Sequence, residues 1–265
     1  MYSSFTIARK YVQYWLTASN RKGHGVHSPF VYDFIKHVLN DSSGHPFYKE
    51  IEQLRKNLLK NKSIITVEDF GAGSTIIPTS KRRVDAIAKS SLKSKKYAQL
   101  LYRIASYFKT DFILELGTSL GITTSYLANS SNSVKVKTME GSEVIATIAR
   151  ENFSSLKLNN IEVMVGDFNK TLPQYLTENP IIQLAFIDGN HRKEPTIHYF
   201  NQIIQHINES TIIIFDDIHW SAEMESAWEE IKNHPSVTLS IDLFFIGLVF
   251  FKKDFKVKQH FSIQF

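Results

Sequence analysis

The sequence contains no cysteine, and this absence removes several kinds of chemistry at once. Disulfide bonds, thiolate catalysis and zinc or iron–sulfur centres held by cysteine are all excluded. A chain without cysteine also fits a reducing compartment, so we expect a cytoplasmic protein.

Long apolar runs and a secretory leader are lacking as well. No run approaches the roughly 18–20 apolar residues that span a bilayer. The opening residues, MYSSFTIARKYVQYWL, do not show the charged, apolar and small-residue regions of a leader. We therefore expect no membrane partner.

Positive charge is in only modest excess over negative charge, with a formal net charge of +5. Such a surface can attract nucleic acid. The densest basic stretch, 81–96, nevertheless lacks the interleaved aromatic residues of a single-strand binding track. We expect no nucleic-acid partner, and we leave open whether the chain forms a homodimer.

The N-terminal part of the chain is predicted to be helical. Apolar residues recur at helical spacing in four segments, 5–16, 26–39, 47–60 and 95–108. In the second segment, Ser28 can cap the helix and Pro29 can occupy its first turn. We expect residues 1–94 to form a helical region that acts as a lid or substrate cap.

A polar stretch at 62–81 separates the third helical segment from the fourth and contains the glycine-rich turn EDFGAGS. The preceding SIITVEDF is compatible with a short strand, whereas Pro78 delays any helix after the turn. No strand–helix–strand unit surrounds this turn, so we interpret it as a connection in the N-terminal region. A lid or a substrate-side loop is the alternative.

From residue 112 the sequence pattern changes to short apolar runs that alternate with amphipathic segments. The apolar runs are 112–116, 134–140, 161–166, 183–188 and 211–217. This alternation predicts parallel strands linked by helices. The last two runs, 236–244 and 245–253, are too close for a parallel crossover and predict an antiparallel hairpin. The fold class is therefore α/β: a Rossmann-like seven-stranded sheet, five parallel strands plus the hairpin, within residues 95–265.

A second glycine turn, ELGTSLG, directly follows the first of these strands. Ligands of such sheets bind beyond the carboxyl ends of the strands. Gly117 and Gly121 allow the backbone to approach a ligand closely, and Thr118 and Ser119 add hydroxyl groups. The spacing lacks the third glycine of a pyrophosphate-binding fingerprint. With Glu115 before it, the turn suits a ligand without phosphates and with a positive charge.

The next two strand ends supply further polar groups. In TMEGS, Glu140 lies 19 residues after Gly121 and beside Gly141, where its carboxylate can accept both hydroxyls of a ribose. In VGDF, Gly166 precedes Asp167, which can accept a hydrogen bond from an adenine amino group. Together with the turn, these residues predict a nucleoside ligand with a cationic tail.

The motifs ELGTSLGITTSYLA, TMEGS and VGDFNKTLP resemble those of the class I S-adenosylmethionine-dependent methyltransferases. The resemblance extends over about residues 95–251 and includes the C-terminal hairpin. It implies that S-adenosylmethionine is the cofactor, bound by the residues just described.

The fourth and fifth strands end in FIDGNH and IIIFDDIHW, a layout similar to that of metal-dependent O-methyltransferases of the catechol and caffeoyl type. In those enzymes an Asp after the fourth strand and an Asp-Asn pair after the fifth bind magnesium. Asp188, Asp216 and Asp217 occupy these positions here, so the last residue departs from Asn.

Crowded carboxylates repel one another, and a divalent cation such as Mg²⁺ relieves the repulsion. The alternative is a site without metal, in which Asp188 lies near the methionine amino group and Asp216 and Asp217 act on the next helix. His191 and His219 closely follow these carboxylates. Each histidine is a candidate general base, with Asp188 as a further catalytic residue, or a structural hydrogen-bonding group.

The leading prediction is an enzyme that moves a methyl group from S-adenosylmethionine to an oxygen of a small-molecule acceptor, with or without Mg²⁺. An RNA or protein methyltransferase on the same fold is the first alternative. A nicotinamide-dependent oxidoreductase and a non-catalytic nucleotide-binding relative are the others. The missing third glycine argues against the oxidoreductase.

Overall fold

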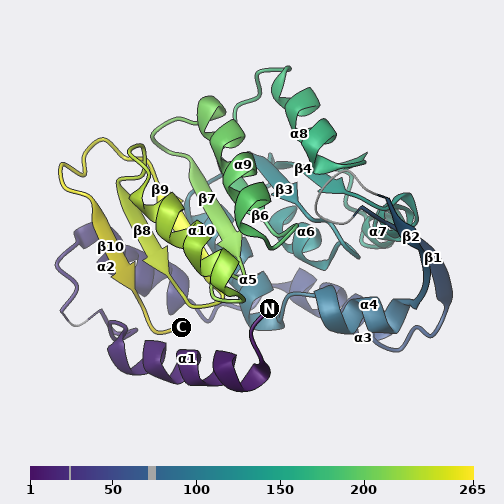
Figure 1. The fold of residues 1–265 in the computed structure, drawn as a ribbon, viewed down its shortest axis with the longest axis horizontal. Helices are drawn as coiled ribbons and strands as arrows, with labels where there is room; N and C mark the ends of the chain where they lie inside the picture. Colours follow the sequence, from purple (N-terminus) through teal and green to yellow (C-terminus); the bar gives the residue numbers. More distant parts are fainter. Residues whose placement is uncertain (24, 71–75) are drawn as a thin grey trace. The chain divides into compact units, whose positions relative to one another are not determined.

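The structure is a computed structural model that describes residues 1–23, 25–70 and 76–265. The chain divides into two compact units. Figure 1 labels their helices and strands. The first unit combines Met1–Asp41 with Pro180–Phe265, and the second unit is Ser42–Asn179. The predicted division into residues 1–94 and 95–265 is a different partition, based on sequence motifs, and it stays a prediction.

The second unit contains three parallel strands, β3 (Phe112–Leu116), β4 (Lys135–Glu140) and β5 (Ile161–Val165). Its helices are α3 (Pro46–Leu58), α4 (Val84–Ser91), α5 (Lys95–Tyr107), α6 (Ile122–Leu127), α7 (Glu143–Ser155) and α8 (Phe168–Leu176). All residues of β3 after the first are buried, as expected for a parallel strand that is covered on both faces.

An antiparallel hairpin of β1 (Ile64–Phe70) and β2 (Ile76–Arg83) interrupts the N-terminal helices of the second unit. The short strand that SIITVEDF is compatible with is observed as β1. Its β-branched residues favour extended backbone. Helix α4, which begins directly after β2, was not predicted. Residues 71–74 of EDFGAGS lie outside the described residues, so its predicted role as a turn stays a prediction.

The first unit contains β6 (Leu184–Ile187) and β7 (Ile212–Asp216), which pair in parallel. Strand β9 (Ile246–Phe250) is antiparallel to both β7 and β8 (Leu239–Asp242), as the predicted hairpin requires. The helical elements are α1 (Ser4–Thr17), α2 (Pro29–Phe34), the π-helix η1 (Ile35–Leu39), α9 (Lys193–Ile203), the 3₁₀-helix η2 (Ile204–His206) and α10 (Ala222–Asn233). Ser28 caps α2 and Pro29 opens it, as predicted.

Within the described residues the main sheet has eight strands, so the prediction of seven was wrong by one. The strand order is β10-β8-β9-β7-β6 in the first unit and β3-β4-β5 in the second. The additional strand is β10 (Gln259–Ser262), which pairs in parallel with β8. It is four residues long and has no apolar run, so its sequence carries little strand signal. Its formation depends on the free hydrogen-bonding edge that β8 offers.

Gly247 in β9 is a position where packing leaves no room for a side chain. A Cβ there would lie 2.7 Å from two atoms of the Trp228 ring, which is buried on α10. We expect Gly247→Ala to lower the free energy of unfolding by about 1–3 kcal/mol, because the ring or the strand must shift. Urea denaturation measures the change. Gly44→Ala is the control, since nothing lies within 4 Å of a Cβ at Gly44; equal stability of the two variants would contradict the prediction.

Candidate functional site

The predicted cofactor turn after β3 is a tight loop held against the end of β4. Gly117, Ser119 and Gly121 have φ angles of 109°, 47° and 79°, in the region that favours glycine. The backbone N–H groups of Gly117 and Thr118 both donate to the carbonyl oxygen of Met139, at 2.9 and 3.1 Å. The loop therefore has one defined path across the ends of two neighbouring strands.

Gly121 ends this loop and caps α6. A Cβ at Gly121 would lie 2.5 and 2.7 Å from two atoms of the Phe153 ring of α7. The side chain of Asn152 donates to the carbonyl oxygen of Leu120 at 2.9 Å. The second glycine of the motif is thus required for packing as well as for its backbone angle.

Glu140, at the end of β4, connects the loop to the following turn. Its Oε2 accepts the N–H of Ser119 at 2.9 Å, and its Oε1 accepts the N–H of Ser142 at 3.0 Å. Gly141 lies between these groups, at the start of the turn to α7. These two hydrogen bonds hold Glu140 in one orientation between the loop and the turn to α7.

Asp167 follows β5 and caps α8. Its Oδ1 accepts the backbone N–H of Asn169 at 2.9 Å and the side-chain amide at 3.0 Å. The preceding Gly166 has a φ angle of 140°, and its N–H donates to the carbonyl oxygen of Glu140 at 2.9 Å. The structure thus places Glu140 and Asp167 at adjacent strand ends within the second unit, as predicted from the sequence.

Glu115 is fully buried within β3. Its Oε2 accepts hydrogen bonds from Thr124 at 2.5 Å and Thr138 at 2.6 Å. Within the described residues, its Oε1 has no hydrogen-bond partner. Burial raises the pKa of Glu115 to about 7, and the charge of Glu140 adds to this, against the opposing effect of the two threonine hydroxyls. The sequence prediction named Glu115 but missed these threonines, one of which follows Gly121 in the ITTS segment.

This burial of Glu115 predicts a pH-dependent stability. Because the pKa rises on folding from 4.5 to about 7, the folded state binds more protons within this window, so stability falls as pH rises through it. We expect a loss of about 3 kcal/mol in the free energy of unfolding between pH 4.5 and 8 from this group. Glu115→Gln should remove that part of the slope, and Glu178→Gln, at an exposed position, should retain it. Urea titrations across this range would contradict the prediction if Glu115→Gln kept the wild-type slope.

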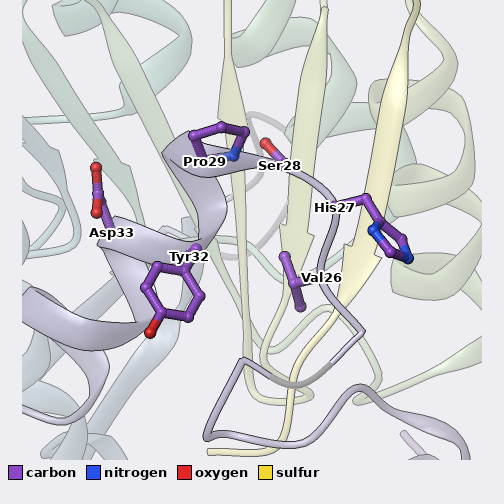
Figure 2. A pocket seen from close by; sticks show the side chains of 6 residues that line it. All are labelled: Val26, His27, Ser28, Pro29, Tyr32 and Asp33. Carbon is purple, nitrogen blue, oxygen red and sulfur yellow. The ribbon is translucent and has the colours of Figure 1, made fainter.

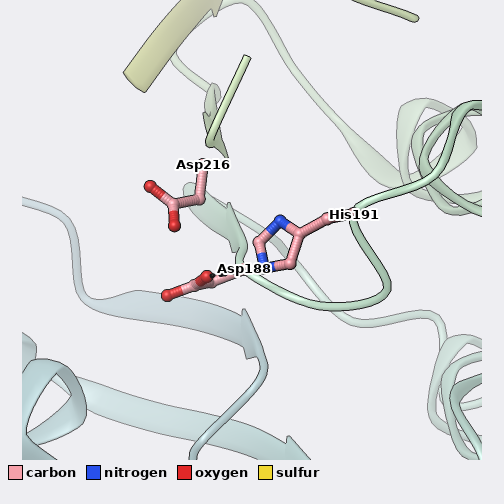
Figure 3. Close-up of side chains that lie close together, drawn as sticks. All are labelled: Asp188, His191 and Asp216. Atoms are coloured by element: carbon pink, nitrogen blue, oxygen red, sulfur yellow. Dashed lines mark ion pairs between the residues drawn. The ribbon is translucent and has the colours of Figure 1, made fainter. Parts of the chain in front are cut away.

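The other predicted site residues lie in the first unit, after β6 and β7. Asp188 follows β6, His191 lies in the loop before α9, and Asp216 ends β7. One side-chain donor atom from each of these three residues lies within 4.8 Å of the others (Figure 3). Asp216 is 2% exposed, whereas Asp188 and His191 are partly accessible. The structure therefore brings together two of the three predicted metal ligands and a histidine.

Asp217 is positioned differently from the expected third ligand. Its φ angle is 53°, and its N–H donates to the carbonyl oxygen of Phe245 at 2.7 Å. Its Oδ2 lies 4.0 Å from His191 Nδ1, while His191 Nε2 lies 3.6 Å from Asp188 Oδ1. His191 is thus flanked by carboxylates on both ring nitrogens. Two carboxylates and an imidazole form a donor set that fits a divalent metal ion, with more nitrogen character than an all-oxygen magnesium site.

His219 has both ring nitrogens engaged within the first unit. Its Nδ1 lies 3.1 Å from Glu225 Oε1, and its Nε2 lies 2.8 Å from Asp242 Oδ2. Burial lowers the pKa of His219, but the hydrogen bonds and charges of Asp242 and Glu225 outweigh it and raise the pKa above its usual value. Glu225 also accepts hydrogen bonds from Lys10 and Tyr2. This arrangement favours the structural alternative for His219, and its partners gave no signal in the sequence.

An open pocket in the first unit is lined by none of the predicted site residues. It has a volume of about 450 Å³ and adjoins the start of α2 (Figure 2). Its lining residues are Val26, His27, Ser28, Pro29, Tyr32 and Asp33. Because it contains no predicted cofactor, metal or catalytic residue, it does not bear on the chemistry discussed above.

Comparisons with known proteins agree with this geometry. Residues 114–218 match a protein family described as a methyltransferase domain. The fold is similar to that of an O-methyltransferase from Bacillus cereus in complex with SAH, with a TM-score of 0.55 and 22% identity over 83% of this chain and 97% of that one. It is also similar to the O-methyltransferase TomG from Streptomyces achromogenes in complex with SAM, with a TM-score of 0.53 and 19% identity over 61% of this chain and 82% of that one.

A curated relative is 26% identical over 148 residues: the uncharacterised protein R132 of Acanthamoeba polyphaga mimivirus. The match covers 50% of this chain, and the chain spans 65% of the length of that relative.

The mostly parallel sheet with its C-terminal antiparallel pair resembles the fold of S-adenosylmethionine-dependent O-methyltransferases of known structure. Residues 114–218 match the family described as a methyltransferase domain. The predicted resemblance and the predicted α/β fold class are confirmed. Within the described residues, no helix is both long and apolar enough to cross a membrane.

Proposed function

We propose that this protein is a methyltransferase that transfers a methyl group from S-adenosylmethionine to a hydroxyl oxygen of a small molecule. The observation that carries the choice of oxygen is the group formed by Asp188, His191 and Asp216. A hydroxyl is a weak nucleophile until its proton is removed or its pKa is lowered, and this group offers the means for either. The two structural relatives described above are named as O-methyltransferases, which supports the same choice.

The residues at the strand ends of the second unit suit the cofactor. We assign the ribose hydroxyls to the carboxylate of Glu140 and the adenine amino group to that of Asp167, which lie at the ends of the adjacent strands β4 and β5. Among the residues that the structure describes, the buried Oε1 of Glu115 has no hydrogen-bond partner, and a bound ammonium group would stabilise the ionised carboxylate. Thr118 and Ser119 belong to the loop that the cofactor would contact. When bound, S-adenosylmethionine supplies a methyl group on a sulfonium centre, which the chain aligns with the acceptor oxygen.

The residues of the first unit can activate the acceptor hydroxyl in two ways, without a metal ion or with one. Without metal, His191 accepts the hydroxyl proton, and Asp188 and Asp217 on either side stabilise the resulting imidazolium. With metal, Asp188, His191 and Asp216 would hold the cation, which would lower the pKa of the hydroxyl. We assign the base to His191 rather than His219, since both nitrogens of His219 are already engaged. The N-terminal residues 1–94 are proposed as the substrate cap.

Calorimetric titration with S-adenosylhomocysteine tests the proposal, first in EDTA and then with Mg²⁺ or Mn²⁺, with NADH as the control ligand. We expect S-adenosylhomocysteine to bind and NADH not to bind. A set of small hydroxylated and amino compounds is then incubated with methyl-labelled S-adenosylmethionine, and label should enter the hydroxyl compounds. Binding of NADH alone would refute the cofactor assignment, and label found only in amines, RNA or protein would refute the acceptor assignment.

A further inference from the structure

Helix α1 is fixed to the first unit through one of its faces (Figure 1). Tyr14 is 8% exposed, and its hydroxyl donates to a backbone carbonyl near the C-terminus. The Tyr11 ring meets the Phe244 ring edge-on, with centroids 5.0 Å apart. Lys10 Nζ donates to both carboxylate oxygens of Glu225, at 2.9 and 3.0 Å. These contacts hold α1 in place and leave its opposite face outward.

The outward face of α1 carries large apolar side chains. Phe5, Val12 and Leu16 are 80%, 57% and 78% exposed. Spacings of seven and four residues place them along one line of the helix surface. Trp15, 38% exposed, borders this line. We call Phe5, Val12, Trp15 and Leu16 the α1 stripe; contiguous exposed apolar side chains of this kind mark interaction sites.

The charged side chains of α1 itself and of the residues that flank it in the sequence are all basic. Residues 1–32 contain no Asp or Glu. Arg9 is exposed on the outward face, four residues after Phe5 and three before Val12, and Arg21 and Lys22 are exposed just beyond the helix. A line of apolar side chains accompanied only by cations complements a surface that is both apolar and anionic.

We propose that the α1 stripe binds an anionic lipid surface, with α1 lying in the plane of the headgroups. Helices bind in this way when aromatic and aliphatic side chains enter the acyl boundary while basic side chains meet anionic headgroups. The expectation of no membrane partner rested on the absence of a spanning run, which a helix on the surface does not need.

A second copy of this chain is a less suitable occupant of the α1 stripe. Packing two stripes face to face would bring the Arg9 side chains into an interface to which α1 contributes no carboxylate. Like charges placed together across an interface oppose association. The charge pattern therefore favours anionic lipid over a dimer of α1 helices.

The test is co-sedimentation of the full chain with vesicles of phosphatidylcholine alone and with an equal mixture of phosphatidylcholine and phosphatidylglycerol. We expect binding to the mixed vesicles that weakens with added salt. The double variant Phe5→Ser/Leu16→Ser should lower the ratio of bound to free protein at least about tenfold. Val257→Ser is the matched control, because Val257 is 73% exposed elsewhere in the first unit. Tryptophan emission should shift to the blue on binding, and Trp15→Phe should abolish the shift.

Three results would overturn the proposal. The first is wild-type protein that stays in the supernatant with anionic vesicles. The second is a folded Phe5→Ser/Leu16→Ser variant, checked by circular dichroism, that binds as tightly as the wild type. The third is a wild-type dimer that this variant converts to monomer while neither protein binds vesicles, which would assign the α1 stripe to a second copy of the chain.

Discussion

Gly121→Ala is expected to weaken the binding of S-adenosylhomocysteine at least about tenfold and to destabilise the second unit. An L-residue at a φ angle of 79° costs roughly 1–2 kcal/mol. The added methyl group would also lie 2.5 Å from Phe153, and relieving such overpacking costs about 1–3 kcal/mol. Either adjustment moves the loop that Glu140 holds through Ser119. Calorimetry measures the affinity, and thermal unfolding measures the stability.

The control for Gly121→Ala is Gly44→Ala, also in the second unit, where a Cβ meets nothing within 4 Å. This variant should bind S-adenosylhomocysteine and unfold as the wild type does. If Gly121→Ala instead retained wild-type affinity, the loop after β3 would not be the cofactor turn. The assignment of ELGTSLG would then have to be abandoned.

Asp216→Asn is expected to weaken the binding of Mn²⁺ by about 100-fold while leaving the affinity for S-adenosylhomocysteine within about twofold of wild type. The substitution preserves the size of the side chain but removes its charge, and Asp216 is one of the three donors that lie within 4.8 Å of one another. Because His191 supplies a nitrogen donor, we expect wild-type protein to bind Mn²⁺ more tightly than Mg²⁺. Titration calorimetry with each metal measures both effects.

Asp254→Asn is the matched control for Asp216→Asn, because Asp254 is an exposed carboxylate in the same unit. It should bind Mn²⁺ as the wild type does. Absence of Mn²⁺ binding in the wild type, or equal binding by Asp216→Asn, would exclude the metal arrangement. His191 would then remain as the general base, and His191→Ala should lower methyl transfer at least about 100-fold.

Most helices and strands could be predicted because their signals are local. The helical spacing of apolar residues in 5–16 and the Ser28–Pro29 pair suffice to place α1 and the start of α2. Strand β10 could not be predicted, since a four-residue segment becomes a strand only when β8 offers its edge. Helix α4 was not predicted from the sequence, because it begins directly after β2, and β2 lies in a polar stretch that gave no clear strand signal.

Only part of the candidate site could be predicted from the sequence. Positions such as Glu140 and Asp167 followed from one rule, that parallel strands end at the same edge of a sheet. The surroundings of Glu115 did not follow, because the hydroxyl groups that contact it come from a helix and a neighbouring strand. Its burial and its raised pKa are consequences of that packing.

The sequence by itself determined the α/β class, the glycine turn after β3 and the set of acidic residues at the strand ends, since these depend on local pattern and on the direction of the strands. Only the tertiary structure decided that His191 joins Asp188 and Asp216, and that Glu225 and Asp242 engage His219. Side-chain partners depend on backbone angles, such as the φ of 53° at Asp217, and on segments distant along the chain. The sequence spacing of two residues encodes neither the backbone angles nor the distant segments that bring their side chains into contact.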